Sequence, residues 1–130
     1  MSYQVRKGRK PGILEIIYEG DVTQLTRLEA IERGWLLMGE KPVHVAIIDF
    51  TKADLHMTHE ATVDFQIRQS GDRGTGRMLI IYVSGPQRER LEFEALVGFD
   101  QGRLIEVVPT LDEAYRLLDE NEPDDVPPVG

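Results

Sequence analysis

The stretch VHVAIIDFTKADLHMTHEAT, from Val43 to Thr62, decides the fold of this chain. Its first part, Val43–Phe50, is an almost unbroken apolar run, which predicts a β-strand buried on both faces. The polar residues that follow predict a loop, and Thr58 stands where a helix is expected to begin. A strand that leads through a loop into a helix N-terminus is the arrangement in which α/β proteins place their functional sites.

The segments on both sides of this stretch alternate between strands and helices. Before it, the pattern predicts two strands joined by a Gly-Pro turn and a helix capped by Asp21, over residues 3–7, 13–18 and 21–38. After it, the pattern predicts helix, strand, helix, strand and helix over residues 58–69, 78–83, 87–97, 103–108 and 110–120. The order ββαβαβαβα predicts an α/β fold with a single open, mixed, mostly parallel sheet and an N-terminal hairpin.

Length and composition limit the classes of protein to consider. The chain of 130 residues predicts one domain over residues 1–120, followed by a disordered, acidic and proline-rich tail over residues 121–130. A net charge of −8 argues against nucleic-acid binding. No apolar run approaches the roughly 20 residues of a membrane span. The absence of cysteine excludes disulfides and thiol catalysis and favours a cytoplasmic protein.

The charges are unevenly distributed along the chain. Basic residues cluster within the first ten positions, at Arg6, Lys7, Arg9 and Lys10, whereas acidic residues crowd the C-terminal part from Asp112 onwards. This pattern fits a solvated surface and tail, and it also fits electrostatic contact between the two ends of the chain or with a partner. The hairpin provides an edge strand, from which we expect a weak homodimer.

Three stretches together resemble the STAS family, named for sulfate transporters and anti-sigma factor antagonists. The resemblance covers about residues 3–119. The stretches are GILEIIYEGDVT at residues 12–23, VAIIDFTKADLHMT at residues 45–58 and EALVGFDQGRLIEVVPTLDEAYRLL at residues 94–118. The last is the most specific, because a glycine-containing helix end, a short strand and a Thr-Leu-x-Glu-Ala helix follow one another as they do in the family.

The resemblance implies a STAS-like fold and a non-catalytic bacterial regulator that binds a protein partner, such as an anti-sigma factor or a kinase-like regulator. Phosphorylated members carry Asp-Ser at the helix start after the central strand, where this chain has Met57–Thr58. The resemblance therefore makes Thr58 the phosphorylation candidate, although Thr58 also fits a plain helix cap. The residues expected in the partner-binding loop are Asp49, Thr51, Lys52, Asp54, His56 and His59.

Other kinds of chemistry fit the sequence less well. Asp54, His56, His59 and Glu60 match no zinc-hydrolase signature, so we predict no metal and no cofactor. Ser84 lacks the flanking glycines of a nucleophile elbow, and we predict no enzyme. The glycine-rich segment 71–77 follows a helix and precedes a strand, which is the reverse of a phosphate-binding loop, so it predicts a flexible connector. The alternative function is a carrier of a small hydrophobic ligand or lipid, with a groove beside Phe65, Ile67, Phe93 and Phe99.

Overall fold

The computed structural model describes residues 3–70 and 78–120. The glycine-rich segment 71–77 and the acidic tail 121–130 lie outside the described residues, and so do the predictions made for them. None of the described helices is long and apolar enough to cross a membrane.

The sheet has five strands in the order β1-β2-β3-β4-β5, with bounds Tyr3–Lys7, Ile13–Val22, Val45–Leu55, Leu79–Val83 and Leu104–Val108. The strands β1 and β2 pair antiparallel, and every later pair is parallel. The predicted mixed, mostly parallel sheet with an N-terminal hairpin is therefore confirmed.

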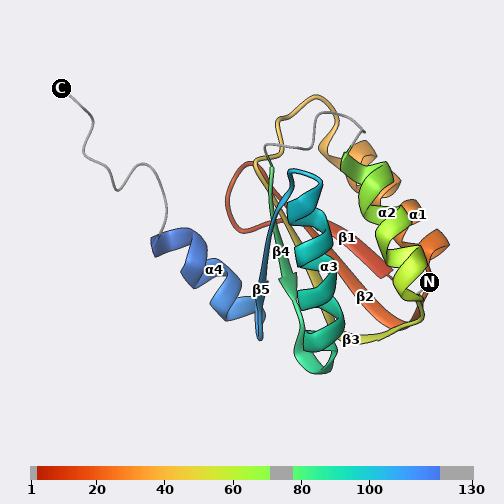
Figure 1. Ribbon diagram of the computed structural model, residues 1–130. Helices are drawn as coiled ribbons and strands as arrows, with labels where there is room; N and C mark the ends of the chain where they lie inside the picture. The colour runs from red at the N-terminus through yellow and green to blue at the C-terminus, as the bar shows by residue number, and fades with distance from the viewer. Residues whose placement is uncertain (1–2, 71–77, 121–130) are drawn as a thin grey trace.

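In the described part of the chain, four α-helices cover the sheet, with bounds α1 Gln24–Met38, α2 His59–Ser70, α3 Arg88–Asp100 and α4 Leu111–Glu120, and a short 3-10 turn η2 (Gly85–Gln87) precedes α3. The helices α1, α2 and α3 lie on one side of the sheet and α4 on the other (Figure 1). The strands follow one another in space as in sequence, so each parallel crossover returns on the same side.

Alternate residues of the central strands supply the two cores. Ile48, Phe50 and Tyr82 point toward α1, α2 and α3, whereas Ile47, Ile81 and Val83 point toward α4. The first part of β3, residues 45–48, and the whole of β4 are buried on both faces, which explains why these segments are continuous apolar runs. The helix α4 packs on the sheet through Ala114 and Tyr115, which are buried, and through Leu111 and Leu118, which are partly buried.

The strands β2 and β3 are longer than predicted. The sequence led us to end β2 at Tyr18 and to place a loop over residues 51–57, but β2 continues to Val22 and β3 continues to Leu55. An irregularity between Ile17 and Glu19 shifts the pairing register, and β2 then pairs with β3 up to the last residues of both strands. Asp49, Thr51, Lys52 and Asp54 are therefore strand residues and do not belong to a loop.

Two helix ends also differ from the prediction. Thr23, and not Asp21, caps α1, since the Thr23 hydroxyl accepts a hydrogen bond from the Thr26 N–H. Gly98 does not end α3, which continues to Asp100. A Cβ at Gly98 would lie 2.4 Å from Cδ1 of Ile105, so glycine at this position allows α3 to approach β5 closely.

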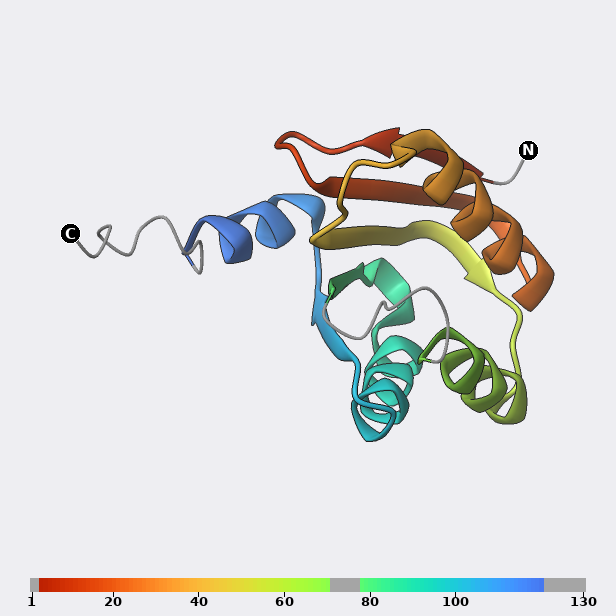
Figure 2. The ribbon, with the colours of Figure 1, turned by 90° about the horizontal axis from the view of Figure 1, so that it is seen from above.

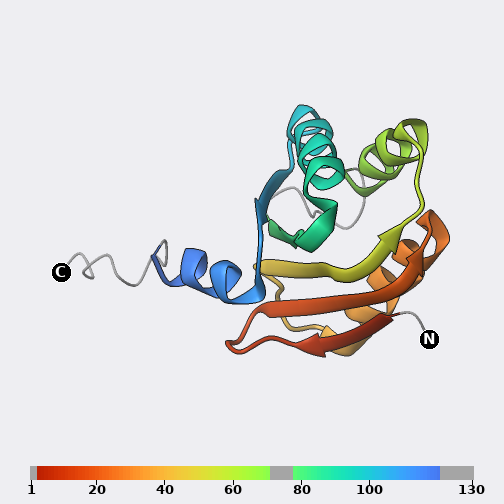
Figure 3. The same cartoon turned by 90° about the horizontal axis from the view of Figure 1, so that it is seen from below.

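The basic and acidic ends of the chain meet in the structure. The β1–β2 turn lies beside α4 (Figures 2 and 3), where Lys10 Nζ is 2.8 Å from Oδ1 of Asp119. The Arg9 guanidinium lies over the Tyr115 ring, 4.2 Å from its centroid. The Tyr115 hydroxyl donates a short hydrogen bond to the buried carboxylate of Glu15. Contact between the two ends of the chain, one of the two interpretations of the charge pattern, is thus observed.

Candidate functional site

Thr58 lies at the rim of an open hollow of about 520 Å³ between the start of α2 and α3. We call it the Thr58 hollow, and its lining residues are Leu55, Met57, Thr58, His59, Glu60, Thr62, Arg90 and Phe93. The Thr58 side chain is exposed, and its Oγ1 accepts a hydrogen bond of 3.0 Å from the Ala61 N–H. Thr58 is therefore the cap of α2, as the sequence predicted, and it stands where free N–H groups and the helix dipole favour negative charge.

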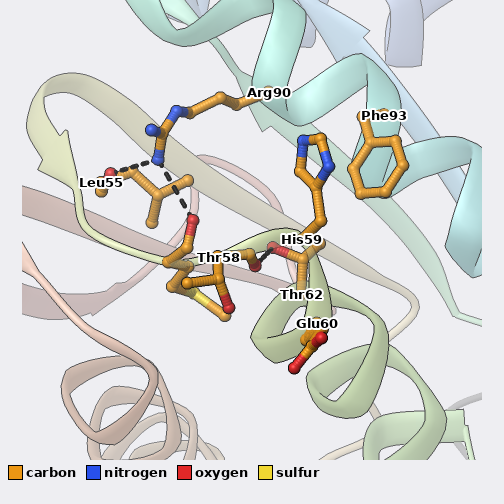
Figure 4. Close-up of a pocket in the computed structure, with 8 residues that line it drawn as sticks. Leu55, Thr58, His59, Glu60, Thr62, Arg90 and Phe93 are labelled. Carbon is orange, nitrogen blue, oxygen red and sulfur yellow. Dashed lines mark hydrogen bonds between the residues drawn. The ribbon is translucent and has the colours of Figure 1, made fainter.

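The helix α3 holds the short connection between β3 and α2 from one side (Figure 4). The Arg90 guanidinium donates to the carbonyl of Leu55 at 2.6 Å and to that of Met57 at 3.3 Å. The His59 ring stacks on the Phe93 ring with centroids 4.4 Å apart. These contacts fix the backbone before and after Thr58, so the surface around Thr58 is ordered before any partner binds.

Met57 connects this surface to a buried polar cluster. Its sulfur lies 3.4 Å from Nη1 of Arg27, which is a residue of α1 and is 1% exposed. The Arg27 guanidinium also lies over the Phe65 ring of α2, 4.0 Å from the centroid. The connection that carries Thr58 is therefore held by α3 on one side and by α1 on the other.

The buried cluster, which we call the Glu94 network, consists of Arg27, Gln66, Tyr82, Glu94 and Arg103. Arg27 donates to both carboxylate oxygens of Glu94, at 2.6 and 2.7 Å. Gln66 donates to the same carboxylate at 2.7 Å, and the Tyr82 hydroxyl donates to it in a short hydrogen bond. Arg103 donates to the Gln66 amide oxygen at 2.7 Å. The network therefore joins α1, α2, α3 and β4 to the residue that precedes β5.

Ionisation in the Glu94 network follows from burial and pairing. Burial alone raises the pKa of Glu94, but the Arg27 guanidinium and the hydrogen bonds from Arg27, Tyr82 and Gln66 outweigh it and hold that pKa below its ordinary value. Burial raises the pKa of the Tyr82 phenol. Glu94 is thus an ionised carboxylate in the core. Glu94 is 1% exposed, although an acidic side chain on a helix ordinarily faces solvent.

The residues predicted for the partner-binding loop are distributed over three places at the carboxyl edge of the sheet. Only His59 lines the Thr58 hollow. Asp49, Thr51 and Lys52 line another hollow of about 460 Å³, beside the start of α4. Asp49 Oδ1 accepts a hydrogen bond of 2.8 Å from the Thr51 N–H, so this carboxylate orders its own strand.

Asp54 and His56 belong to an exposed group with Asp21. The His56 Nε2 lies 3.0 Å from a carboxylate oxygen of Asp21 and 3.2 Å from one of Asp54. Asp21 and Asp54 come together because they are register partners in β2 and β3. Of the described residues, these three could offer ligand atoms to a metal ion. Of the four residues that the sequence did not favour as metal ligands, His59 and Glu60 are not part of this group, and the His59 ring stacks on Phe93.

The catalytic and carrier alternatives gain no support from the geometry. The Ser84 hydroxyl is buried and has no hydrogen-bond partner among the described residues, and the Asp49 carboxylate faces the Thr51 amide. Phe65 is in the core, 2% exposed, whereas Ile67 and Phe99 are on the surface, 49% and 71% exposed. Phe93 lines the Thr58 hollow, so the four apolar side chains do not share one groove.

Comparison with known proteins supports the fold. A scan against models of protein families gives no match, and a search of curated proteins gives none either. Among solved structures, the chain is similar to the anti-sigma factor antagonist SpoIIAA in its unphosphorylated form. The match covers 90% of this chain and 97% of that chain, with a TM-score of 0.55 and 13% sequence identity. At this identity the likeness shows the fold alone, and it confirms the STAS-like fold that the sequence predicted.

Proposed function

We propose that this chain is a non-catalytic regulatory module that binds a protein partner through the Thr58 hollow, and that phosphorylation of Thr58 opposes this binding. The observation that carries the proposal is an exposed hydroxyl at the N-terminus of α2, on backbone already fixed by Arg90. The similar fold of an anti-sigma factor antagonist supports a partner of the anti-sigma factor or kinase-like class.

The electrostatics of the hollow suit a hydroxyl that changes its charge state. A phosphate on Thr58 would be favoured by the dipole of α2 and opposed by Glu60 in the first turn. Arg90 of α3 lines the same hollow, but its guanidinium already donates to the carbonyls of Leu55 and Met57. Phosphorylation would therefore leave the fold intact and alter the charge of the contact surface.

Two substitutions at Thr58 test the proposal. For each variant we would measure the thermal stability and the affinity for a protein partner captured from lysate of the native host. Thr58→Glu should alter folding stability by only some tenths of a kcal/mol, because the charge lies at the favourable end of the helix dipole. In a contact without a compensating cation, the same charge should weaken partner binding by about 2 kcal/mol or more. Thr58→Ala should lose the cap, about 1 kcal/mol of stability, and keep the partner affinity.

Matched variants separate the site from general effects. Thr110 caps α4, since its Oγ1 accepts a hydrogen bond of 3.2 Å from the Glu113 N–H, so Thr110→Ala controls for the loss of a cap. Gln101→Glu adds one negative charge at an exposed position after α3, far along that helix from Arg90. If Thr58→Glu and Gln101→Glu bind the partner equally well, Thr58 is only a cap and the proposal is wrong.

A further inference from the structure

A hollow of about 460 Å³ lies at the amino end of the parallel strands, where the β1–β2 turn meets the connection from α1 to β3. We call it the basic hollow. Its two sides are joined by hydrogen bonds from the N–H groups of His44 and Val45 to the Gly12 carbonyl. The strand β3 begins here at Val45 and ends beside the Thr58 hollow at Leu55, so its 11 residues separate the two sites.

The charge of the basic hollow is opposite to that of the whole chain. Its lining contains no acidic side chain. The basic side chains in the lining are Lys7, Arg9, Lys10, Lys41 and His44. The chain as a whole carries a net charge of −8. A concave surface lined by one sign of charge concentrates ions of the opposite sign. This lining therefore favours an anion.

The cations of the basic hollow differ in how they are held. Arg9 lies over the Tyr115 ring and 3.8 Å from Asp112, and Lys10 lies 2.8 Å from Asp119, so contacts with α4 position both. Among the residues that the structure describes, no ion pair involves Lys7 or Lys41. The ammonium groups of these two lysines are thus available to a ligand, next to two cations that are already ordered.

The floor of the basic hollow is apolar. Ile13 and Met38 are each 5% exposed, and Pro11 and Pro42 lie beside them in the lining. A Cβ at Gly12, where φ is +84°, would lie 2.7 Å from Cδ2 of His44, so glycine allows the imidazole ring to lie against the turn. An apolar floor with a few cationic groups at its rim is the usual composition of a site for a small organic ligand.

We propose that the basic hollow binds a small organic phosphate, with the phosphate between Lys7 and Lys41 and the organic part on the Ile13–Met38 floor. Lysine ammonium groups bind phosphate as point charges, and the volume is within the usual range of about 300–1,000 Å³ for ligand pockets. A nucleic acid would extend beyond the hollow over an acidic protein, which opposes its binding. The proposal does not depend on the function assigned to Thr58.

The test is a titration of the full chain, monitored by amide chemical shifts, with three probes: adenosine diphosphate, ribose 5-phosphate and inorganic sulfate. The organic phosphates should shift the amides of Gly8, Gly12 and His44 and bind with sub-millimolar affinity, at least tenfold more tightly than sulfate. The Lys7→Gln/Lys41→Gln variant should weaken this binding at least tenfold without altering the thermal midpoint. The control variant Arg33→Gln/Lys52→Gln removes the same charge elsewhere and should bind like the wild type.

Four results would overturn the proposal. If neither organic phosphate shifts these amides at millimolar concentration, the hollow has no such ligand. Binding that weakens equally in both double variants would reflect net charge and no defined site, and sulfate binding as tight as that of the organic phosphates would indicate an adventitious ion only. A duplex oligonucleotide is added as a fourth probe: if it binds the wild type more tightly than either organic phosphate and does not bind Lys7→Gln/Lys41→Gln, the ligand of the basic hollow is a nucleic acid and not a small organic phosphate.

Discussion

The carboxylate of Glu94 accepts hydrogen bonds from α1, α2 and β4 at once, through Arg27, Gln66 and Tyr82. A buried ion pair contributes little net stability, because the desolvation of two charges offsets most of their attraction. Removal of one partner is costly, since it leaves the other charge buried alone. The Glu94 network thus favours one relative position of α1, α2 and α3. Arg27 also contacts Met57, so the same network positions the residue next to Thr58.

Glu94→Gln should lower the free energy of unfolding by about 3–5 kcal/mol, because the Arg27 guanidinium would remain buried without a counter-charge. Glu92→Gln, on an exposed position of the same helix, should change it by less than about 0.5 kcal/mol. The double variant Arg27→Met/Glu94→Gln should be less destabilised than the sum of its single variants. Urea denaturation of the wild type, Arg27→Met, Glu94→Gln and the double variant measures this coupling, and simple additivity would show that the pair acts as two independent residues.

The lowered pKa of Glu94 also predicts the direction of acid unfolding. Because the folded-state pKa is below the ordinary carboxyl value of about 4.3, the stabilisation is complete above that pH and is lost as the pH falls through the folded pKa. Wild-type stability should therefore fall steeply below about pH 4, whereas Glu94→Gln, already destabilised, should show a shallower dependence. Denaturant midpoints measured across this range test the prediction, and parallel curves would contradict it.

At the level of elements, α4 depends on one polar contact as well as on apolar packing. Tyr115 places its hydroxyl on the buried Glu15 carboxylate and also accepts a hydrogen bond of 3.0 Å from the Arg9 N–H. Burial, and after it the hydrogen bond to Glu15, raise the pKa of Tyr115 to about 12. The ion pair of Lys10 with Asp119 is exposed and should contribute less than about 1 kcal/mol.

Tyr115→Phe should destabilise the protein by about 1–3 kcal/mol, because Glu15 loses a hydrogen-bond donor in a buried environment. Tyr3→Phe is the matched control. The Tyr3 hydroxyl is buried without a partner among the described residues, so its removal should be neutral or slightly stabilising. The thermal midpoints of the two variants give the comparison. If both variants lower the midpoint equally, the hydrogen bond of Tyr115 to Glu15 does not contribute to stability as we expect.

The sequence predicted the order of the elements because the central strands are apolar on both faces and the helices have recognisable ends. It did not predict the length of β3, although the alternation of buried Ala53 and Leu55 with exposed Lys52 and Asp54 is the pattern of a strand. It missed the Glu94 network because the buried face of α2 is largely polar. The buried residues of that face, apart from Phe65, are Thr62, Gln66 and Gln69.

At the level of the whole molecule, sequence periodicity reveals local burial but not the distant pairing of charges. Arg27 and Glu94 are 67 positions apart, and because each is charged, the periodicity of apolar residues indicates neither their burial nor their pairing. Thr58 was accessible to prediction because a cap is a local feature. The basic hollow could not be predicted from the sequence, because the β1–β2 turn and the α1–β3 connection that line it come together only when the sheet forms.

The open edge of β1 gives the last prediction, a weak homodimer in which two copies of β1 pair antiparallel across a two-fold axis. In a register centred on Val5, Gln4 of one copy would face Arg6 of the other. Gln4→Lys should then abolish the dimer through repulsion of like charges, and Gln4→Glu should strengthen it. Gln4 is exposed, so neither change should affect folding. Sedimentation equilibrium at several concentrations distinguishes the three proteins. A wild type that stays monomeric throughout, or two variants that behave alike, would show that β1 does not pair in this way.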